Sequence, residues 1–393
     1  MEENDLDKWI PPFNLRCITA CLNLEPDGRE DRFNEAFFFL SQAREHFMAR
    51  GYTVQMIRMA TNPFPEYVDW VSPDPLAPIL EISKLCEEKD ITLSIGPVIW
   101  DDSEDPRLRE LFFHIMTETS AFSSIVLTGE NGLIHPKAIG TAARTIARLA
   151  ELKPMANFNF AATARIPPDT PFFPAAFHSG GTDSFTLGTE AASLVSEVFE
   201  EAGTEEASSR LLSTRYLEEF SRLEEISLSL ASKTGWRYGG LDTSPAPMKE
   251  VSIGRAIESL TGVPFGSAGT LSACALITSV IKKVPVKQAG YCGLMLPVME
   301  DSVLARRAEE GRYGLYELLN YSAVCGTGLD VIPLPGIATA EEIARLLGDL
   351  AALSVKLSKP LSARLIPIPG KKAGDPVTLD SPYLVPTTVF ELK

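Results

Sequence analysis

The amino-acid sequence predicts an α/β fold in which helices cover a parallel or mixed sheet around one core. Segments with strand-like patterns alternate with segments of helical spacing almost throughout the 393 residues. Such alternation is typical of sheets whose strands are joined by outer helices. With 45% hydrophobic residues, the chain can build one large core. It shows neither an internal repeat nor a linker, so we expect a single domain over residues 1–393.

The first half of the chain contains the clearest alternation. We predict strands at 13–23, 52–59, 91–98, 122–128 and 157–164. Helices are predicted at 28–50, 79–89, 105–119 and 136–152. Gly51 is a suitable stop for the first of these helices, because glycine commonly ends a helix. A proline-rich connection at 62–78 is expected at the surface.

The second half begins with an irregular segment, IPPDTPFFPAAFHSGGTDS, followed by two long helical segments on either side of Gly203. Further strands are predicted at 237–243, 288–296, 329–334 and 363–368, which brings the expected sheet to about nine or ten strands. The apolar run 271–281 is shorter than the ~20 residues that cross a membrane, so it predicts a buried helix.

Net charge and the N-terminal sequence restrict the class of protein. A net charge of −16 repels phosphate backbones and anionic lipids, which argues against nucleic-acid and membrane partners. It does not argue against a small anionic ligand in a local basic pocket. The acidic start MEENDLDKW, followed by Pro11-Pro12, differs from the basic start of a signal peptide. The six cysteines form no Cys-x-x-Cys pair, so we expect reduced thiols in a cytoplasmic protein.

His178 is the first candidate for chemistry. It lies in the irregular segment, where prolines and the Gly180-Gly181 pair define an unusual path. Its side chain could act as a general base or a ligand, because histidine transfers protons near neutral pH. The alternative is a structural histidine that hydrogen bonds the loop backbone. We expect Asp183 or Ser184 to cap a following helix.

Two further segments are candidates for holding an anion. In FGSAGTLSA, Gly266 and Gly269 allow close approach to a ligand, and Thr270 begins a helix whose free amides could bind phosphate or carboxylate. The spacing matches neither common nucleotide-binding motif, and an ordinary capped helix is the alternative. In PGKKAGD, Lys371 and Lys372 could clamp an anion, or could form an exposed basic turn.

Carboxylates follow several predicted strands. Asp242 in LDTSPAP, Asp330 in GTGLDVIPLPG and the pair Glu300-Asp301 all lie at strand ends, where α/β folds place functional groups. They could orient a ligand or hold Mg²⁺, although no spacing resembles a dedicated metal loop. For Asp242, a solvated turn is the alternative. The metal and the cofactor are therefore both unknown from the sequence.

Cys325 in SAVCGTGLD is a candidate nucleophile, because flanking glycines make its backbone adaptable. A packing role is the alternative, since most cysteines in apolar surroundings are inert. Cys17 and Cys21 lie on one face of a predicted strand and are expected in the core.

Several of these segments carry a family resemblance. They are FFPAAFHSGGTDSFTLGTEAA, LDTSPAP, VPFGSAGTLSA, LPVMED, AVCGTGLDVIPLPG and IPIPGKKAGD. From about Asn157 onward the chain resembles the family called domain of unknown function 711 and the related UPF0210 proteins. The resemblance implies a pyruvate formate-lyase-like barrel of about ten strands with helices outside. It does not imply glycyl-radical chemistry, because the Arg-Val-x-Gly-Tyr loop is absent and only Gly290-Tyr291 approaches it.

Three functional hypotheses follow. In the first, the protein is an enzyme for a small anionic metabolite, with His178 moving protons, Asp242 and Asp330 orienting groups, and the glycine-rich loop and lysine turn holding the anion. The second is a non-enzymatic metabolite-binding or sensor protein. The third is a thiol-dependent enzyme that uses Cys325. The first requires positions 178, 242, 269 and 330 to converge at one mouth of a barrel. A homo-oligomer is possible in each case.

Overall fold

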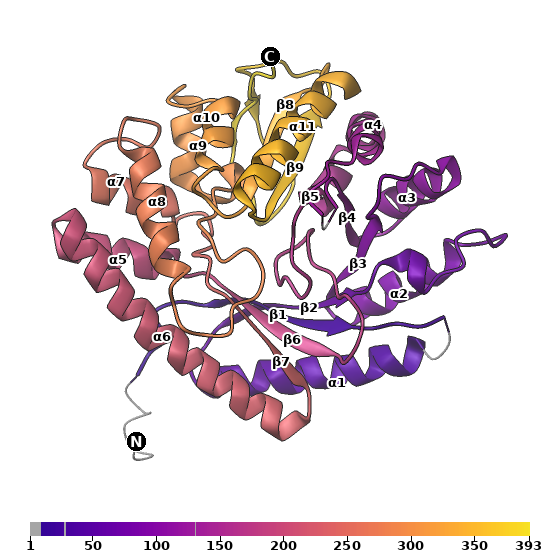
Figure 1. Cartoon of the computed structure of the whole chain (residues 1–393), viewed down its shortest axis with the longest axis horizontal. Coiled ribbons are helices and arrows are strands. Elements are labelled where there is room, and N and C mark those ends of the chain that lie inside the picture. Colours follow the sequence, from indigo (N-terminus) through magenta and orange to yellow (C-terminus); the bar gives the residue numbers. More distant parts are fainter. Residues whose placement is uncertain (1–8, 27–28, 130) are drawn as a thin grey trace.

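The computed structural model describes residues 9–26, 29–129 and 131–393. Its centre is a nine-stranded sheet with the order β7-β6-β1-β2-β3-β4-β5-β9-β8, and helices lie outside it (Figure 1). The strands of this sheet are β1 (Leu15–Leu22), β2 (Val54–Thr61), β3 (Thr92–Ile99), β4 (Phe122–Val126), β5 (Phe160–Ala164), β6 (Ser184–Thr189), β7 (Arg237–Asp242), β8 (Gly328–Pro335) and β9 (Leu361–Ile368). A small separate sheet pairs β10 (Pro376–Val377) with β11 (Thr387–Thr388). The α/β class and the outer position of the helices are confirmed.

The α-helices mostly follow the predicted segments. They are α1 (Arg29–Met48), α2 (Ala77–Glu88), α3 (Pro106–Glu118), α4 (Pro136–Leu152), α5 (Ala192–Ala202), α6 (Glu205–Thr234), α7 (Ile253–Thr261), α8 (Thr270–Ile281), α9 (Ser302–Glu309), α10 (Leu315–Tyr321) and α11 (Ala340–Leu357). Short 3-10 helices are η2 (Phe64–Glu66), η3 (Pro154–Asn159) and η4 (Val298–Glu300). Gly28, the first residue of the predicted first helix, and the acidic residues 1–8 lie outside the described residues.

Three groups of parallel strands make up the large sheet. Strands β1 to β5 are parallel to their neighbours, as are the pairs β6–β7 and β8–β9. The groups meet antiparallel where β6 pairs with β1 and where β9 pairs with β5. The two edge strands are both bridged by one segment, since Gln288 pairs with Leu241 of β7 and Pro297 pairs with Asp330 of β8. This segment therefore links the edges of the sheet.

The segment 288–297 corrects the prediction of a regular strand at 288–296. Gly290 has φ +87° and Cys292 has φ +44°, and neither value is compatible with extended backbone. A side chain at position 290 would also place its Cβ only 2.3 Å from Oδ2 of Asp242. The composition is strand-like, but the chain makes isolated bridges here because these two residues turn it.

Strand β6 corrects a second prediction. The sequence analysis expected a helix directly after Ser184, whereas Ser184 is the first residue of a buried strand that pairs with β1. Helix α5 begins only at Ala192, so neither Asp183 nor Ser184 caps it. These residues form a strand because β6 pairs with β1 on one side and with β7 on the other, and such tertiary pairing overrides local preference.

The connection between β5 and β6 folds back over the inner face of the sheet. The carbonyl oxygen of Pro171 accepts hydrogen bonds from Thr19 of β1 and from Arg58 of β2. Ser94 of β3 donates to the carbonyl of Ala176 at 2.7 Å. Figure 1 shows this connection in the middle of the molecule, together with the irregular segment before α9. Loops thus line the interior and can position a site there.

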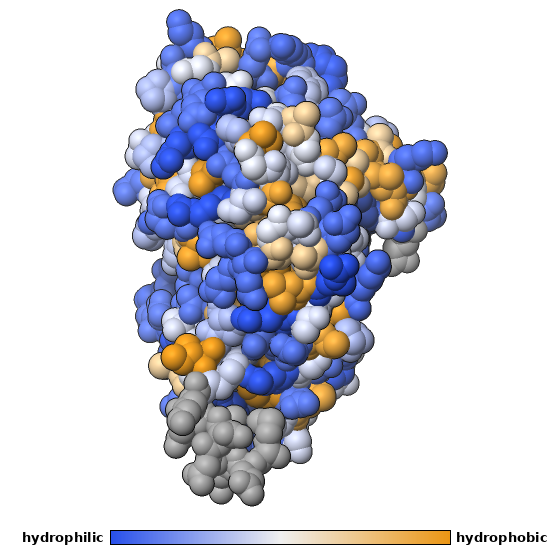
Figure 2. All heavy atoms as spheres, turned by 90° about the vertical axis from the view of Figure 1, so that its left-hand side faces the viewer, coloured by the Kyte–Doolittle hydropathy of each residue, from blue (hydrophilic) through white to orange (hydrophobic). Residues whose placement is uncertain are grey.

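The outer surface carries few large hydrophobic groupings on the side shown in Figure 2. On that side, which carries α5 and α7, hydrophobic residues occur in small groups among hydrophilic ones. Within the described part of the chain, no helix combines the length and the apolar character needed to span a membrane.

Candidate functional site

A central cavity of about 490 Å³ lies inside the fold. It takes residues from near the starts of β1, β3, β4 and β5, and from β2, β8 and β9. Its walls also include the connection between β5 and β6 and the segment that links the sheet edges. The polar residues that line it include Arg16, Arg58, Tyr291, Glu300, Thr327, Asp330, Ser362 and Arg364.

Five charged residues, four of which line this cavity, form a continuous series of ion pairs that we name the ion-pair chain. Arg16 contacts Glu190 at 3.2 Å and Glu300 at 2.7 Å. Arg364 contacts Glu300 at 2.8 Å and Asp330 at 2.7 Å. Glu300 therefore shares its two oxygens between two guanidinium groups. The order is Glu190, Arg16, Glu300, Arg364, Asp330, which is three carboxylates and two guanidinium groups.

Burial and ion pairing act in opposite directions on the pKa values of Glu300 and Asp330, and the net result differs between the two. Burial alone would raise the pKa of Glu300, but the guanidinium groups of Arg364 and Arg16 hold that pKa below its ordinary value. At the end of the ion-pair chain, burial raises the pKa of Asp330, and the single neighbour Arg364 does not fully offset this effect. The charge of Asp330, at the end of the ion-pair chain, is thus less well compensated than that of Glu300 in its middle.

Arg58 is the third arginine of the cavity and lies outside the ion-pair chain. Its side chain is 7% exposed, and among the described residues no carboxylate pairs with it. Its guanidinium donates to the carbonyl of Pro171 at 3.2 Å and to Sδ of Met56 at 3.3 Å, while its Nε has no partner. The ring of Phe173 lies 4.9 Å below it. Burial lowers the pKa of Arg58. The nearby Arg16 and Arg364 also lower it, whereas Cys17 and the Glu300 carboxylate, which forms no ion pair with Arg58, act in the opposite direction without reversing the change.

The sequence analysis did not select these three arginines. Each one is the only charged residue of its strand: LRCITACL, VQMIRMAT and LSARLIPI. A charged residue within a mostly buried strand is uncommon and is therefore the signal that could have identified these arginines. The sequence predictions considered loops and strand ends, and for that reason did not include them.

Asp242 supports the cavity wall without lining it. It is the last residue of β7, as predicted, and it is fully buried. Its carboxylate accepts hydrogen bonds from the backbone amides of Ser244 at 3.0 Å, Tyr291 at 2.8 Å and Cys292 at 3.0 Å, and from the Ser244 hydroxyl at 2.5 Å. Burial raises its pKa to about 6 although these bonds oppose the change. The carboxylate thereby fixes Tyr291, whose hydroxyl lies 2.8 Å from the hydroxyl of Ser362.

His178 lies elsewhere in the fold. Its backbone amide donates to the carbonyl of Thr61, the last residue of β2, and its Nδ1 is 2.6 Å from Asp169. Asp169 also accepts bonds from Ser184 and Arg237, at the starts of β6 and β7. The histidine is 1% exposed and its Nε2 has no partner. His178 does not line the central cavity.

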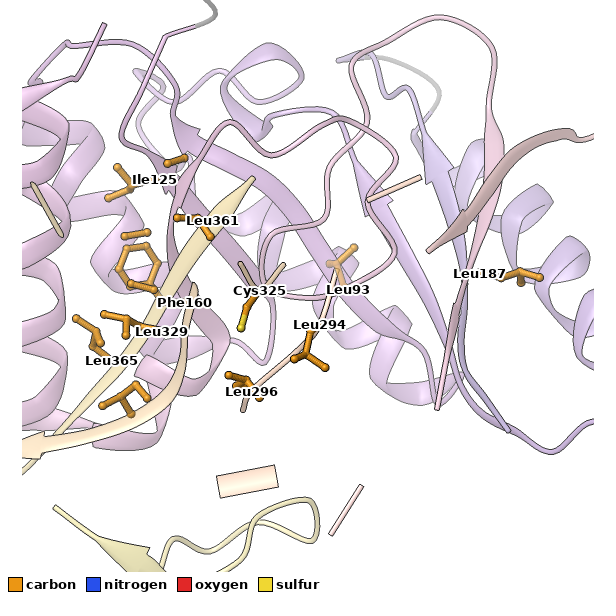
Figure 3. Close-up of a cluster of buried hydrophobic side chains, with 14 of the residues drawn as sticks. Leu93, Ile125, Phe160, Leu187, Leu294, Leu296, Cys325, Leu329, Leu361 and Leu365 are labelled. Carbon is orange, nitrogen blue, oxygen red and sulfur yellow. The ribbon is translucent and has the colours of Figure 1, made fainter. Parts of the chain in front are cut away.

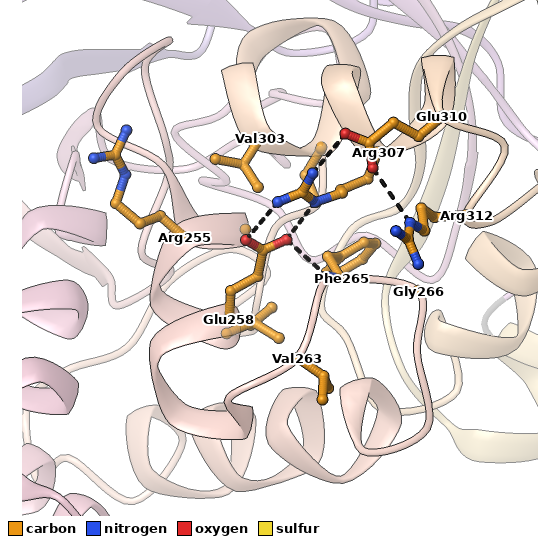
Figure 4. A network of polar contacts seen from close by, with 12 residues as sticks. Arg255, Glu258, Val263, Phe265, Gly266, Val303, Arg307, Glu310 and Arg312 are labelled. Carbon is orange, nitrogen blue, oxygen red and sulfur yellow. Dashed lines mark hydrogen bonds and ion pairs between the residues drawn. The ribbon is translucent and has the colours of Figure 1, made fainter.

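The glycine-rich loop packs against helices outside the cavity. The amide of Gly266 donates to the hydroxyl of Thr270, and the adjacent Phe265 amide donates to Glu258 at 2.8 Å. Figure 4 shows Glu258 held in turn by Arg307, which contacts it at 2.6 Å. Gly269, with φ +104°, immediately precedes α8. These contacts place the loop on α7, α8 and α9, away from the cavity lining.

Cys325 and the lysine turn also lie outside the cavity lining. Cys325 is 1% exposed, and Figure 3 shows it among hydrophobic side chains that include Leu294 and Leu296. Such apolar surroundings are typical of cysteines that serve in packing. Lys371 and Lys372 lie in the turn after β9, where Lys372 is exposed and its amide donates to Asp375.

Of the candidate residues selected from the sequence, the structure places Asp330 and Glu300 on the central cavity. Positions 178, 242 and 269 do not line it, so the four junctions do not converge on this one cavity. Across the described ranges, no group of three or more His, Cys, Asp or Glu side chains could hold a metal ion. Any role in chemistry for the candidate residues is still a prediction.

Comparisons with known proteins agree with the family resemblance. The model of a family described as Uncharacterised ACR (DUF711) matches residues 11–380. A UPF0210 protein from Pyrobaculum aerophilum is 36% identical over 248 residues, which are 60% of this chain and 55% of that protein. A UPF0210 protein from Oenococcus oeni is 28% identical over 275 residues, 67% of this chain and 61% of that protein. The chain thus spans between half and two thirds of the length of these relatives.

One solved structure, titled anaerobic ribonucleotide reductase, is similar over 90% of this chain and 72% of its own. The TM-score is 0.37 and the sequence identity is 9%.

Proposed function

This chain belongs to the family described as Uncharacterised ACR (DUF711), and we propose that its central cavity binds a small organic molecule through a carboxylate that contacts Arg58. The observation that supports the proposal is how the charge of Arg58 is compensated. It is a buried guanidinium on the cavity wall that has no carboxylate partner within the described residues. The other two cavity arginines are both paired twice.

A buried charge without a counter-ion is costly for the folded protein. Desolvation of an ion in a protein interior costs several kcal/mol, and a carbonyl oxygen or a thioether offsets only part of that cost. A ligand carboxylate would supply the missing charge and accept two parallel N–H bonds from the planar guanidinium. The ligand would therefore gain affinity from a site that the protein has already desolvated.

The remaining walls indicate the size and character of the ligand. A cavity of about 490 Å³ lies in the range of small-molecule sites. Phe158, Phe172 and Phe173 line it and provide apolar contact area. Exposed carboxylates at Glu87 and Asp90 are also part of the lining and would repel a polyanion. These features favour a singly charged carboxylate over a multiply charged phosphate.

Thermal unfolding with matched ligands tests this proposal. Hexanoate and benzoate should raise the melting temperature of the wild type, whereas the neutral hexanamide and benzamide should not. The variant Arg58→Met should show no response to either acid. Arg345, which is exposed on α11, supplies the control, and Arg345→Met should respond as the wild type does. If neither acid stabilises the wild type, or if Arg58→Met responds equally, the proposal is wrong.

A further inference from the structure

The ion-pair chain and Arg58 carry opposite formal charges. The ion-pair chain contains three carboxylates and two guanidinium groups, so its formal charge is −1. Arg58 forms no ion pair with it and has a formal charge of +1. These six side chains therefore sum to zero, and the further lining carboxylates Glu87, Asp90 and Asp380 are exposed. The buried part of the site is thus complementary to a ligand that is itself neutral but carries separated charges.

The negative region ends at Asp330, which lines the cavity. Its Oδ1 accepts from Nε of Arg364 at 2.7 Å, and within the described residues this is the only side-chain bond to its carboxylate. The other oxygen keeps its capacity to accept, because an ionised carboxylate offers about four acceptor sites. Burial raises the pKa of Asp330, and the nearby Glu300 carboxylate raises it further, against the opposing effect of Arg364.

Thr327 supplies a second free acceptor on the same wall. It precedes β8 and lines the cavity, and its buried hydroxyl has no hydrogen-bond partner among the residues that the structure describes. Its neighbour Ser362 is already engaged, since that hydroxyl donates to the carbonyl of Thr327 and contacts Tyr291. Buried hydroxyl groups are usually bonded, so an unpartnered one on a cavity wall indicates a place for a ligand donor.

We propose that the ligand is a free amino acid, with its carboxylate on Arg58 and its ammonium group on Asp330 and Thr327. This inference rests on the proposed function, because it uses the same contact to Arg58. An ammonium group carries three donors and a positive charge, which match the free carboxylate oxygen and the free hydroxyl. A simple carboxylate would compensate Arg58 and leave the −1 region unchanged.

The entrance to the cavity is consistent with a zwitterion. Glu87, Asp90 and Asp380 are exposed carboxylates that belong to the lining, and no exposed lysine or arginine is among the residues that line the cavity. This negative potential disfavours entry of a net anion and does not oppose a neutral zwitterion. The ammonium group would instead be attracted at the entrance.

Titration calorimetry and thermal unfolding of the full chain test the inference. The probes are the twenty common α-amino acids, β-alanine and 4-aminobutyrate, each compared with the same acid lacking its amino group. At least one amino acid should bind the wild type about tenfold more tightly than its deaminated counterpart, as expected for one added charge-assisted contact. The variant Asp330→Asn should bind both members of that pair equally, because it retains an acceptor for Arg364 and loses the charge.

Matched variants distinguish carboxylate binding by Arg58, which is the proposed function, from ammonium binding by Asp330, which is the further inference. Asp349→Asn, on the exposed face of α11, should keep the tenfold preference. Arg58→Met should lose both ligands. If carboxylates bind through Arg58 but amino acids show no preference, the zwitterion is wrong and the proposed function holds. If Asp330→Asn keeps the preference, Asp330 does not bind the ammonium group. If nothing binds through Arg58, both proposals are wrong.

Discussion

The ion-pair chain and Arg58 lie on the same cavity and differ in how their charges are compensated. Arg16 and Arg364 each contact two carboxylates, and Glu300 contacts both arginines. Arg58 has only a carbonyl, a sulfur atom and an aromatic ring. A charge compensated within the protein contributes to the architecture, whereas a charge left open on a cavity is available to a ligand. We therefore expect substitution by methionine to lower the free energy of unfolding at Arg364 and to raise it at Arg58.

The largest effect is expected for Arg364→Met. This change leaves Asp330 without its partner and Glu300 with only Arg16, so two buried carboxylates lose compensation. We expect the free energy of unfolding to fall by about 3 kcal/mol. Urea denaturation at neutral pH measures it, with Arg345→Met as a control that should change stability by less than ~0.5 kcal/mol. A loss no larger than that of the control would show that the ion-pair chain contributes little.

The substitution Arg58→Met should have the opposite sign. It replaces an uncompensated buried cation by an apolar side chain of similar length, next to Phe173 and Met56. Without ligand, the free energy of unfolding should rise by about 1–2 kcal/mol. The same urea experiment measures this change. Destabilisation comparable to that of Arg364→Met would mean that the protein itself compensates Arg58, and the comparison would fail.

A smaller effect on stability is expected from Asp242, which belongs neither to the ion-pair chain nor to the surroundings of Arg58. Its carboxylate is buried and its oxygens already accept four bonds, yet burial raises its pKa to about 6 from 3.8. The folded protein therefore holds this proton to higher pH than the unfolded chain does. The stability from this group is complete below pH ~4 and is lost as the pH rises through ~6.

The measurement is the stability of the wild type relative to Asp242→Asn as a function of pH. It should fall by roughly 1 kcal/mol between pH 5 and pH 7. A difference that stays constant over this interval, or that grows with pH, would contradict the raised pKa.

The sequence predicted the fold class and most of the elements. Strands such as β2 and β9 are apolar and bounded by helical segments, and local pattern is sufficient to find them. β6 was missed because the six residues SFTLGT are stabilised as a strand by pairing with β1 and β7, which are distant in sequence. The prediction of a regular strand at 288–296 was wrong. Its composition is strand-like, but Gly290 and Cys292 have positive φ angles and turn the backbone.

The candidate site was harder to predict than the fold. Asp330 and Glu300 were selected as carboxylates at predicted strand ends, and both line the cavity. Asp242 was selected for the same reason but supports the wall without lining it. Most of the other candidates were chosen for their loops, and loops of this kind are distributed over the whole molecule. The three cavity arginines become a site only when β1, β2 and β9 are brought together by the sheet, and single-sequence patterns carry no information about that long-range pairing.

A crystal structure of the full chain grown with the tightest-binding amino acid tests the central claim most directly. We predict ligand density in the cavity, with carboxylate oxygens ~2.9 Å from the guanidinium of Arg58 and the ammonium group at a similar distance from Asp330. A cavity that contains only water, with the Arg58 side chain turned onto a carboxylate of the protein, would contradict the account.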